Sequence, residues 1–363
     1  MEQGKARRVL FLGSALVGLA ILAALAFWVD LGETGRQLSR VGLAGVAAFF
    51  LNIALTLVGP MLSWHLLMRS VGIPVSPGTT LASSLMGFAC NLISPMSYFG
   101  GEGVRTYHIS SVTKAPKRLV LATIVVSELQ VLTALAVFLL GALGVAAIGA
   151  SLTGMKLVLA AAGGLGLSVL VVALVALLIG NARPSVRILD VLIACRLFPA
   201  TLRGLRESAL ATEGSIREIL LHRRAIVLLG QVAALTGPIA HFLRPLLYFW
   251  LLGKRGAELP GLAALSGFFV FSQLVYMLPT TPAGLGVYEG GVIGLFRMFS
   301  WNPSDGAAYG ILLRLDDVIY VLVGFTLVAR FGLAQWMGGG RLAAAKEAPA
   351  EDVVAPLPSP ERR

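Results

Sequence analysis

Residues 91–105 read Asn91-Leu-Ile-Ser-Pro-Met-Ser-Tyr-Phe-Gly-Gly-Glu-Gly-Val-Arg105 and interrupt a hydrophobic run with one proline, three glycines, a glutamate and an arginine. Proline lacks a backbone N–H donor, and each glycine costs about 1 kcal/mol relative to alanine inside a helix. Lipid tolerates non-helical backbone only where protein or a water-filled cavity covers it. The segment therefore predicts a helix break beside a cavity, if it lies at membrane depth.

The same pattern recurs near the other end of the chain. Six residues separate Ser94-Pro95 from Glu102-Gly103, and six separate Thr281-Pro282 from Glu289-Gly290, so that 282 − 95 and 289 − 102 both equal 187. Two Gly/Pro-interrupted apolar segments, one in each half, indicate a transporter binding site built on an inverted repeat. The alternative is two ordinary loops that share turn residues by chance.

The composition is that of a membrane protein. The chain is 57% hydrophobic and only 13% charged, whereas soluble domains have about 25% charged residues. The net charge of +11 comes from arginines gathered between apolar runs, which is the positive-inside pattern and gives no support to nucleic-acid binding. Cys90 lies in an apolar run and Cys195 in a basic segment, so no disulfide framework is expected.

Eight apolar runs define the expected architecture. Six are long enough to span a bilayer, which takes about 20 residues: 9–29, 43–68, 119–149, 157–180, 225–252 and 306–333. The runs 81–93 and 259–278 end at the two breaks and have returning arms at 104–112 and 289–301. We predict an all-α polytopic membrane protein with about six full transmembrane helices and two broken re-entrant hairpins. Whether 119–149 forms one span or more stays open.

The polar segments set the expected domains and topology. Residues 1–337 form one transmembrane domain, residues 181–224 an amphipathic segment with eight arginines, and residues 338–363 a disordered tail. The basic N-terminus and the arginine-rich segment are expected in the cytoplasm, together with the C-terminus. The two hairpins then enter from opposite faces. Segment 181–224 is expected to form one or two amphipathic helices, and a solvated loop is favoured over a lipid-headgroup patch or a docking site.

Two motifs carry a family resemblance. Gly100-Gly101-Glu102-Gly103-Val104-Arg105 resembles the broken segment of the bacterial and archaeal flippase-like membrane family, although that family has two residues between the last glycine and the arginine. This family includes the transmembrane portion of lysylphosphatidylglycerol synthases. The more specific motif, at residues 278–289, resembles the family element Pro-x-x-Pro-Gly-Gly-x-Gly-x-x-Glu, with Ala283 at a usual glycine.

Further residues extend the resemblance over most of residues 10–335. Arg314, within Leu-Leu-Arg, matches an arginine that the family tends to carry in a late span. Glu128 lies where members often have an acid followed by arginine, but Leu129 follows here. The resemblance implies movement of a lipid between leaflets of a bacterial cell (inner) membrane. Because no aminoacyl-transferase domain is seen after residue 335, the family's lipid-modifying activity is not expected.

The leading hypothesis is a lipid translocase that moves an anionic or phosphate-bearing lipid through a polar cavity formed by the two broken helices. The guanidinium groups of Arg105 and Arg314 suit paired phosphate oxygens. The nearby acids balance them or carry a proton. Glu289 is the better proton carrier, because no arginine follows it until Arg297. Asp317 fits an ion pair with Arg314 equally well. The candidate headgroup-binding residues are Asn91, Pro95, Gly100, Gly101, Glu102, Arg105, Glu128, Pro279, Pro282, Gly284, Gly286, Glu289, Arg314 and Asp317.

Two charged or titratable residues are assigned a different role. His241 and Arg244 share one face of the span 225–252. Pro238 and Pro245 predict that this span is bent, so a structural or interfacial role is favoured for both residues.

Two other classes of function stay open. A polyprenyl-phosphate-dependent glycosyltransferase is supported by Asp30 and Glu33 just outside the first span, and an ion-coupled transporter of a small anion would use the same broken helices. We predict no catalytic residue, no metal site and no cofactor, because the four histidines lack metal-ligand spacing and no P-loop is present. The expected partners are membrane lipids, and a homo-oligomer is compatible with the sequence.

Overall fold

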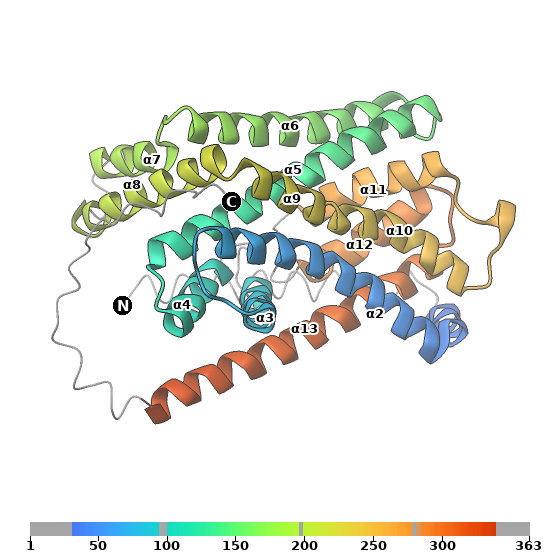
Figure 1. The fold of residues 1–363 in the computed structure, drawn as a ribbon. Helices are drawn as coiled ribbons and strands as arrows, with labels where there is room; N and C mark the ends of the chain where they lie inside the picture. Colours follow the sequence, from blue (N-terminus) through green and yellow to red (C-terminus); the bar gives the residue numbers. More distant parts are fainter. Residues whose placement is uncertain (1–30, 94–99, 196–198, 278–280, 282–283, 339–363) are drawn as a thin grey trace.

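The computed structural model describes residues 31–93, 100–195, 199–277, 281 and 284–338. Within these ranges all the regular structure is helical (Figure 1). The first half contains α2 (Leu31–Ser70), α3 (Pro77–Ile93), α4 (Gly101–Thr113), α5 (Lys117–Ile148) and α6 (Gly154–Ile179). The second half contains α7 (Pro184–Ala194), α8 (Pro199–His222), α9 (Arg224–Ala234), α10 (Thr236–Leu251), η1 (Gly256–Glu258), α11 (Leu262–Tyr276), α12 (Val287–Met298) and α13 (Pro303–Gly338).

Five described helical segments are long and apolar enough to cross a membrane: Gly32–Ser70, Lys117–Ile148, Gly154–Ile179, Arg224–Leu251 and Gly256–Tyr276. The first four overlap predicted spans, and α13 covers the predicted span 306–333. The predicted span 9–29 lies outside the described residues. The molecule is therefore an all-α polytopic membrane protein, as the composition predicts.

The fifth segment, Gly256–Tyr276, was predicted as one arm of a hairpin rather than as a span. Its α-helical part, α11, has 15 residues. At 1.5 Å per residue that is about 22 Å, less than the 30 Å or so of a hydrocarbon core. The 21-residue length is reached only by adding η1 and its connection. By length and composition the whole segment is a candidate span, so the hairpin arm stays a prediction.

Three details of the long helices answer questions that the sequence left open. Residues 119–149 form one continuous span, because α5 runs unbroken over 32 residues. The span 225–252 is divided at Leu235 into α9 and α10, three residues before Pro238, whereas Pro245 lies inside α10; the bend itself stays a prediction. α2 contains a non-helical residue, Gly42, with φ 64° and ψ 174°. Residues 31–41 therefore form a separate helical piece between the predicted spans 9–29 and 43–68.

The arginine-rich segment forms the two helices α7 and α8. Arg206 on α8 donates from Nε to a carboxylate oxygen of Asp190 on α7 at 2.8 Å, and this hydrogen bond holds the pKa of Asp190 below its ordinary value. Ile216 and Ile219 on α8 are buried in a hydrophobic cluster with residues of α2 and α5. The segment is therefore packed against the bundle on one side, and it is not a loop that water surrounds.

The long helices α5 and α13 each contact both hairpins, α3–α4 and α11–α12. α5 packs on α4 and also on α11, where the rings of Phe138 and Phe269 lie 5.2 Å apart. α13 packs on α12 and also on α3, where the rings of Phe88 and Tyr320 lie 5.3 Å apart. In Figure 1 the α3–α4 pair and α13 lie side by side, on the opposite side of the bundle from α6. Each helix pair is thus held by the long helix that follows it and by the long helix that follows the other pair.

Candidate functional site

The first break begins α4 with a carboxylate that binds the helix start. Glu102 lies in the first turn of α4, and one of its oxygens accepts the backbone N–H of Gly100 at 2.9 Å. Gly100 has φ 141°, a conformation that favours glycine. A carboxylate in the first turn complements the partial positive charge of a helix N-terminus. The helix-start role is therefore observed directly for Glu102.

Arg105 joins this helix start to α5. Its Nη2 lies 2.7 Å from a Glu128 oxygen and 3.4 Å from a Glu102 oxygen. The Arg105 side chain is 12% exposed, and its guanidinium lies 5.6 Å from the centre of the Trp64 ring. We call Glu102, Arg105 and Glu128 the first charged cluster. It ties the start of α4 to the long helix that follows.

The two arms of the first hairpin also touch through backbone. The Asn91 side-chain oxygen, near the end of α3, accepts the buried N–H of Gly101 at 2.7 Å. Gly101 lies against the backbone of Gly87, and a Cβ at position 101 would overlap the Gly87 carbonyl group. Glycine is therefore required at position 101 by the close approach of α3 and α4. At Gly103 a Cβ would meet nothing within 4 Å.

The second break begins α12 in a related way. Glu289 lies in the first turn of α12, and one of its oxygens accepts the N–H of Gly286 at 2.7 Å. Upstream of it, Gly284 donates its N–H to the Thr281 carbonyl oxygen at 2.9 Å, with φ 63°. The Thr281 hydroxyl donates to the Leu285 carbonyl oxygen at 2.8 Å. The helix start is again built from glycines in left-handed conformations and a glutamate.

Arg314 ties this second helix start to α13. Its Nε donates to Glu289, and its Nη1 lies 2.8 Å from an oxygen of Asp317 one turn further along α13. The guanidinium lies 5.6 Å from the centre of the Tyr288 ring. We call Glu289, Arg314 and Asp317 the second charged cluster. The sequence analysis missed this partner of Glu289, because Arg314 is 25 positions away along the chain.

Each cluster lies at one of the two breaks, but the arginine is on a hairpin arm in the first cluster and on a long helix in the second. Adding the repeat offset of 187 to Arg105 gives Val292, and adding it to Glu128 gives Leu315, next to Arg314. In the first half the arginine is on the hairpin arm and an acid is on the long helix. In the second half the arginine is on the long helix and an acid is on the hairpin arm. Each cluster pairs one arginine with two carboxylates.

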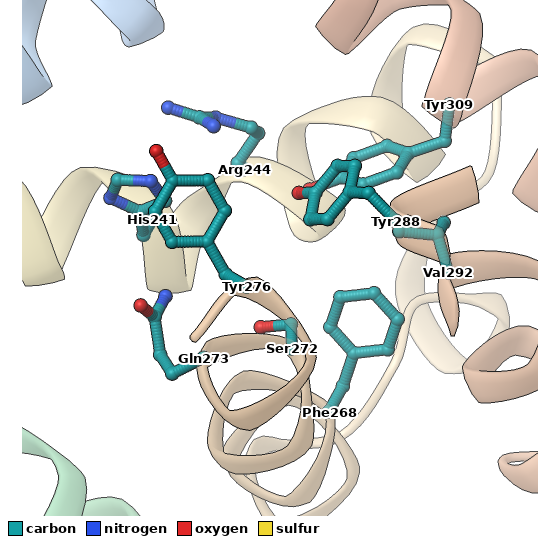
Figure 2. A pocket seen from close by; sticks show the side chains of 9 residues that line it. All are labelled: His241, Arg244, Phe268, Ser272, Gln273, Tyr276, Tyr288, Val292 and Tyr309. Carbon is teal, nitrogen blue, oxygen red and sulfur yellow. The ribbon is translucent and has the colours of Figure 1, made fainter. Parts of the chain in front are cut away.

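A small cavity lies between α10, α11, α12 and α13 (Figure 2). We call it the Arg244 cavity, and its lining residues are His241, Arg244, Phe268, Ser272, Gln273, Tyr276, Tyr288, Val292 and Tyr309. The cavity is small, with room for one or two water molecules. Tyr288 both lines this cavity and lies under the guanidinium of Arg314. The cavity therefore adjoins the second charged cluster.

The comparison with protein families identifies the chain. Residues 15–324 match the family described as the lysylphosphatidylglycerol synthase TM region. The chain belongs to this family. A UPF0104 membrane protein of Methanothermobacter thermautotrophicus is 24% identical over 338 residues, which cover 88% of this chain and 92% of that protein. No solved structure matches the chain.

The lysylphosphatidylglycerol synthase TM-region match spans both breaks and both charged clusters, which confirms the predicted resemblance. Of the predicted site residues, Asn91, Gly100, Gly101, Glu102, Arg105 and Glu128 gather at the start of α4. Gly284, Gly286, Glu289, Arg314 and Asp317 gather at the start of α12. Pro95, Pro279 and Pro282 lie outside the described residues. The predicted set thus divides into two groups, one at each break.

The Arg244 cavity was not predicted as a site in this member of the lysylphosphatidylglycerol synthase TM-region family. From the sequence, a structural or interfacial role was predicted for Arg244 and His241. An available signal was the arginine itself, because an ionisable residue inside an apolar span is a functional candidate by default. Among the described residues, no group of three or more His, Cys, Asp or Glu side chains is arranged to hold a metal ion.

Proposed function

We propose that this protein is a flippase-like translocase that moves a lipid with an anionic or phosphate-bearing headgroup between the leaflets of the membrane. The observation that supports this most is the matching construction of the two helix starts. Each is a Gly-rich break followed by a first-turn glutamate, and each is tied to a long helix by an arginine. Paired broken helices of this kind are typical of transporter binding sites.

The charges suggest how a headgroup couples to movement of the hairpins. Both arginines already have carboxylate partners, so a phosphate reaches either one only by competing with those carboxylates. In the first half this competition loosens the contact between α4 and α5, and in the second half it loosens the contact between α12 and α13. Binding of the headgroup then releases a hairpin from its long helix. The lipid tails stay in the bilayer throughout.

Several further features belong to this proposal. The two halves are an inverted repeat, and the reciprocal packing of α5 and α13 on both hairpins supports that relationship. The protein acts in a bacterial inner membrane with both termini in the cytoplasm. Its role is transport of the lipid and not chemical modification of it.

The glycosyltransferase alternative gains no support from its two acids. Asp30 lies outside the described residues. Glu33 is engaged at the start of α2, where its oxygens lie 2.6 Å from Nη2 of Arg36 and 2.6 Å from the amide nitrogen of Gln37. A carboxylate held in this way is part of the local helix structure.

The test is lipid movement in reconstituted vesicles. Proteoliposomes carry a trace of phospholipid with a fluorescent headgroup label, and a membrane-impermeant reductant bleaches the label in the outer leaflet. We expect bleaching beyond half of the label with the wild-type protein, and little beyond half with Arg314→Gln. The control is Arg206→Gln, which removes an arginine from an exposed ion pair.

Three results would overturn the proposal. One is bleaching that stops at half with folded wild-type protein. Another is equal activity of wild type and Arg314→Gln. The third is uptake of radiolabelled phosphate without lipid movement, which would favour the small-anion transporter.

A further inference from the structure

Arg244 is a buried arginine that has no carboxylate partner among the described side chains. Its residue is 5% exposed, and its Nη2 atom has no hydrogen-bond partner within the described residues. Nε donates to the side-chain oxygen of Asn52 at 2.9 Å, and the Asn52 amide donates to the Ala240 carbonyl oxygen at 3.1 Å. Asn52 is therefore oriented by α10 and presents its oxygen to the guanidinium. The neutral amide does not balance the charge.

The lack of a counter-charge separates Arg244 from the arginines of the two charged clusters. No described carboxylate lies within ion-pair distance of it. Asp317 is within electrostatic range, but its ion pair is with Arg314. An arginine stays charged in proteins, and a buried charge without a partner is costly. An external anion at Arg244 would remove that cost without displacing any carboxylate.

The walls of the Arg244 cavity supply further hydrogen-bonding groups. Figure 2 shows the hydroxyl groups of Tyr288 and Tyr309 pointing in the same direction, towards the middle of the cavity. Gln273 contributes an amide from α11. The cavity has room for one or two water molecules between these groups. The charged oxygens of a phosphate group would take the places of these waters.

One residue of the cavity wall is also exposed at the surface of the helical bundle. Tyr276, at the end of α11, lines the cavity and is itself 48% exposed. Ile239 and Leu243 on α10 are exposed on the same helix as Arg244. An approaching group would enter past Tyr276, and the exposed Ile239 and Leu243 give α10 an apolar surface suited to lipid chains.

We propose that the Arg244 cavity is a phosphate-binding site, in which Arg244 and the tyrosine hydroxyl groups bind the charged oxygens of a phosphate group. This site is separate from the two charged clusters, and it does not depend on the proposed translocation. The phosphate belongs either to a lipid headgroup or to a soluble ion, since both present the same oxygens. The exposed apolar side chains of Ile239 and Leu243 on α10 favour the lipid.

The experiment measures binding by the purified full-length protein in detergent. Melting temperature and native mass spectrometry are recorded with dioctanoyl phosphatidylglycerol, with inorganic phosphate, and with dioctanoyl glycerol, which lacks the phosphate. Sodium chloride at matched ionic strength controls for screening. The variants are Arg244→Met, which removes the charge, and Tyr309→Phe, which keeps the ring. Arg206→Gln is the control for loss of an exposed arginine.

We expect phosphatidylglycerol to bind and to raise the melting temperature of the wild type, and dioctanoyl glycerol to do neither. Arg244→Met should weaken this binding about tenfold or more, as for a lost hydrogen bond to a charged group. Tyr309→Phe should weaken phosphatidylglycerol binding less. If Arg244→Met does not fold, the result with Tyr309→Phe tests the site. Binding of inorganic phosphate alone would support the site but assign it to a soluble ion. Equal binding by wild type and both variants, or no binding by the wild type, would overturn the proposal.

Discussion

Arg314 on α13 and Glu289 in the first turn of α12 form an ion pair that joins two helices across 25 positions of sequence. The same glutamate binds the N–H of Gly286, so each of its oxygens has a partner. The Glu289 side chain is 13% exposed and that of Arg314 is 19% exposed. The contact thus combines a helix cap with a partly buried ion pair. Its loss should affect both folding and transport.

Removal of Arg314 should therefore destabilise the protein strongly. Arg314→Gln leaves Glu289 and Asp317 without their cation; loss of one partner costs about 3–5 kcal/mol for a fully buried pair, and less for this partly buried one. The double variant Arg314→Gln/Glu289→Gln should recover part of this loss, because one uncompensated charge is gone. Thermal unfolding in detergent, followed by circular dichroism, measures both. Equal melting temperatures for wild type and Arg314→Gln would show that the pair does not stabilise the fold.

Gly101 should tolerate no side chain. A Cβ there overlaps the Gly87 carbonyl group, and because backbone of both helices is involved the hairpin must open. We expect Gly101→Ala to lower stability by about 1–3 kcal/mol, as overpacking does, and Gly101→Val to abolish lipid movement. Gly103→Ala is the matched control two positions away, and it should gain up to about 1 kcal/mol from helix propensity. Similar melting temperatures for the two alanine variants would contradict the close approach of α3 and α4.

Gly284 should be sensitive for a different reason. A Cβ there would lie 3.6 Å from Cβ of Tyr288, an ordinary contact, but φ is 63°. Holding a side chain in the left-handed region costs about 1–3 kcal/mol. We expect Gly284→Ala to be moderately less stable and Gly284→Val to lose lipid movement in the vesicle assay. Gly294→Ala, at an open helical position in α12, serves as the control. Wild-type transport by Gly284→Val would remove the role assigned to this turn.

Asn91 should contribute through its acceptor oxygen rather than through its size. Asn91→Ala leaves the buried N–H of Gly101 without its partner, at a cost of about 1–3 kcal/mol. Asn91→Asp keeps an acceptor and adds negative charge at the start of α4, so it should be closer to wild type. Melting temperatures of the two variants in the same detergent give the comparison. If the aspartate variant were the less stable of the two, the acceptor role would be wrong.

The proposed topology predicts opposite labelling of two loops. The α7–α8 segment and the connection from α10 to α11 lie at opposite ends of the bundle in Figure 1. In a Cys90→Ala/Cys195→Ser background, Arg206→Cys should react with a membrane-impermeant maleimide only from the cytoplasmic side. Lys254→Cys should react only from the outer side. Intact and inverted vesicles distinguish the two, and reaction of both from one side would refute the inverted-repeat topology.

The sequence by itself determined the class of the protein and the positions of the breaks. Long apolar runs predict spans because a bilayer accepts only helices whose backbone groups are satisfied internally, and α5, α6 and α9–α10 follow those runs. Proline and glycine interrupt helices through their own backbone chemistry, so α3 ends and α4 begins on either side of 94–99 as expected. The ion pair of Glu102 with Arg105 was also foreseeable, since three positions span one helical turn.

Only the tertiary structure decided which charges meet and which buried arginine has no carboxylate beside it among the described residues. Glu289 obtains Arg314 through the packing of α12 on α13, and Glu128 reaches Arg105 through the packing of α4 on α5. The Arg244 cavity lies where four helices meet, so no local sequence pattern predicts it. Local sequence sets the backbone conformation and the buried face of each helix. The partner of a buried charge depends on residues that are distant in the chain, and packing alone brings them together.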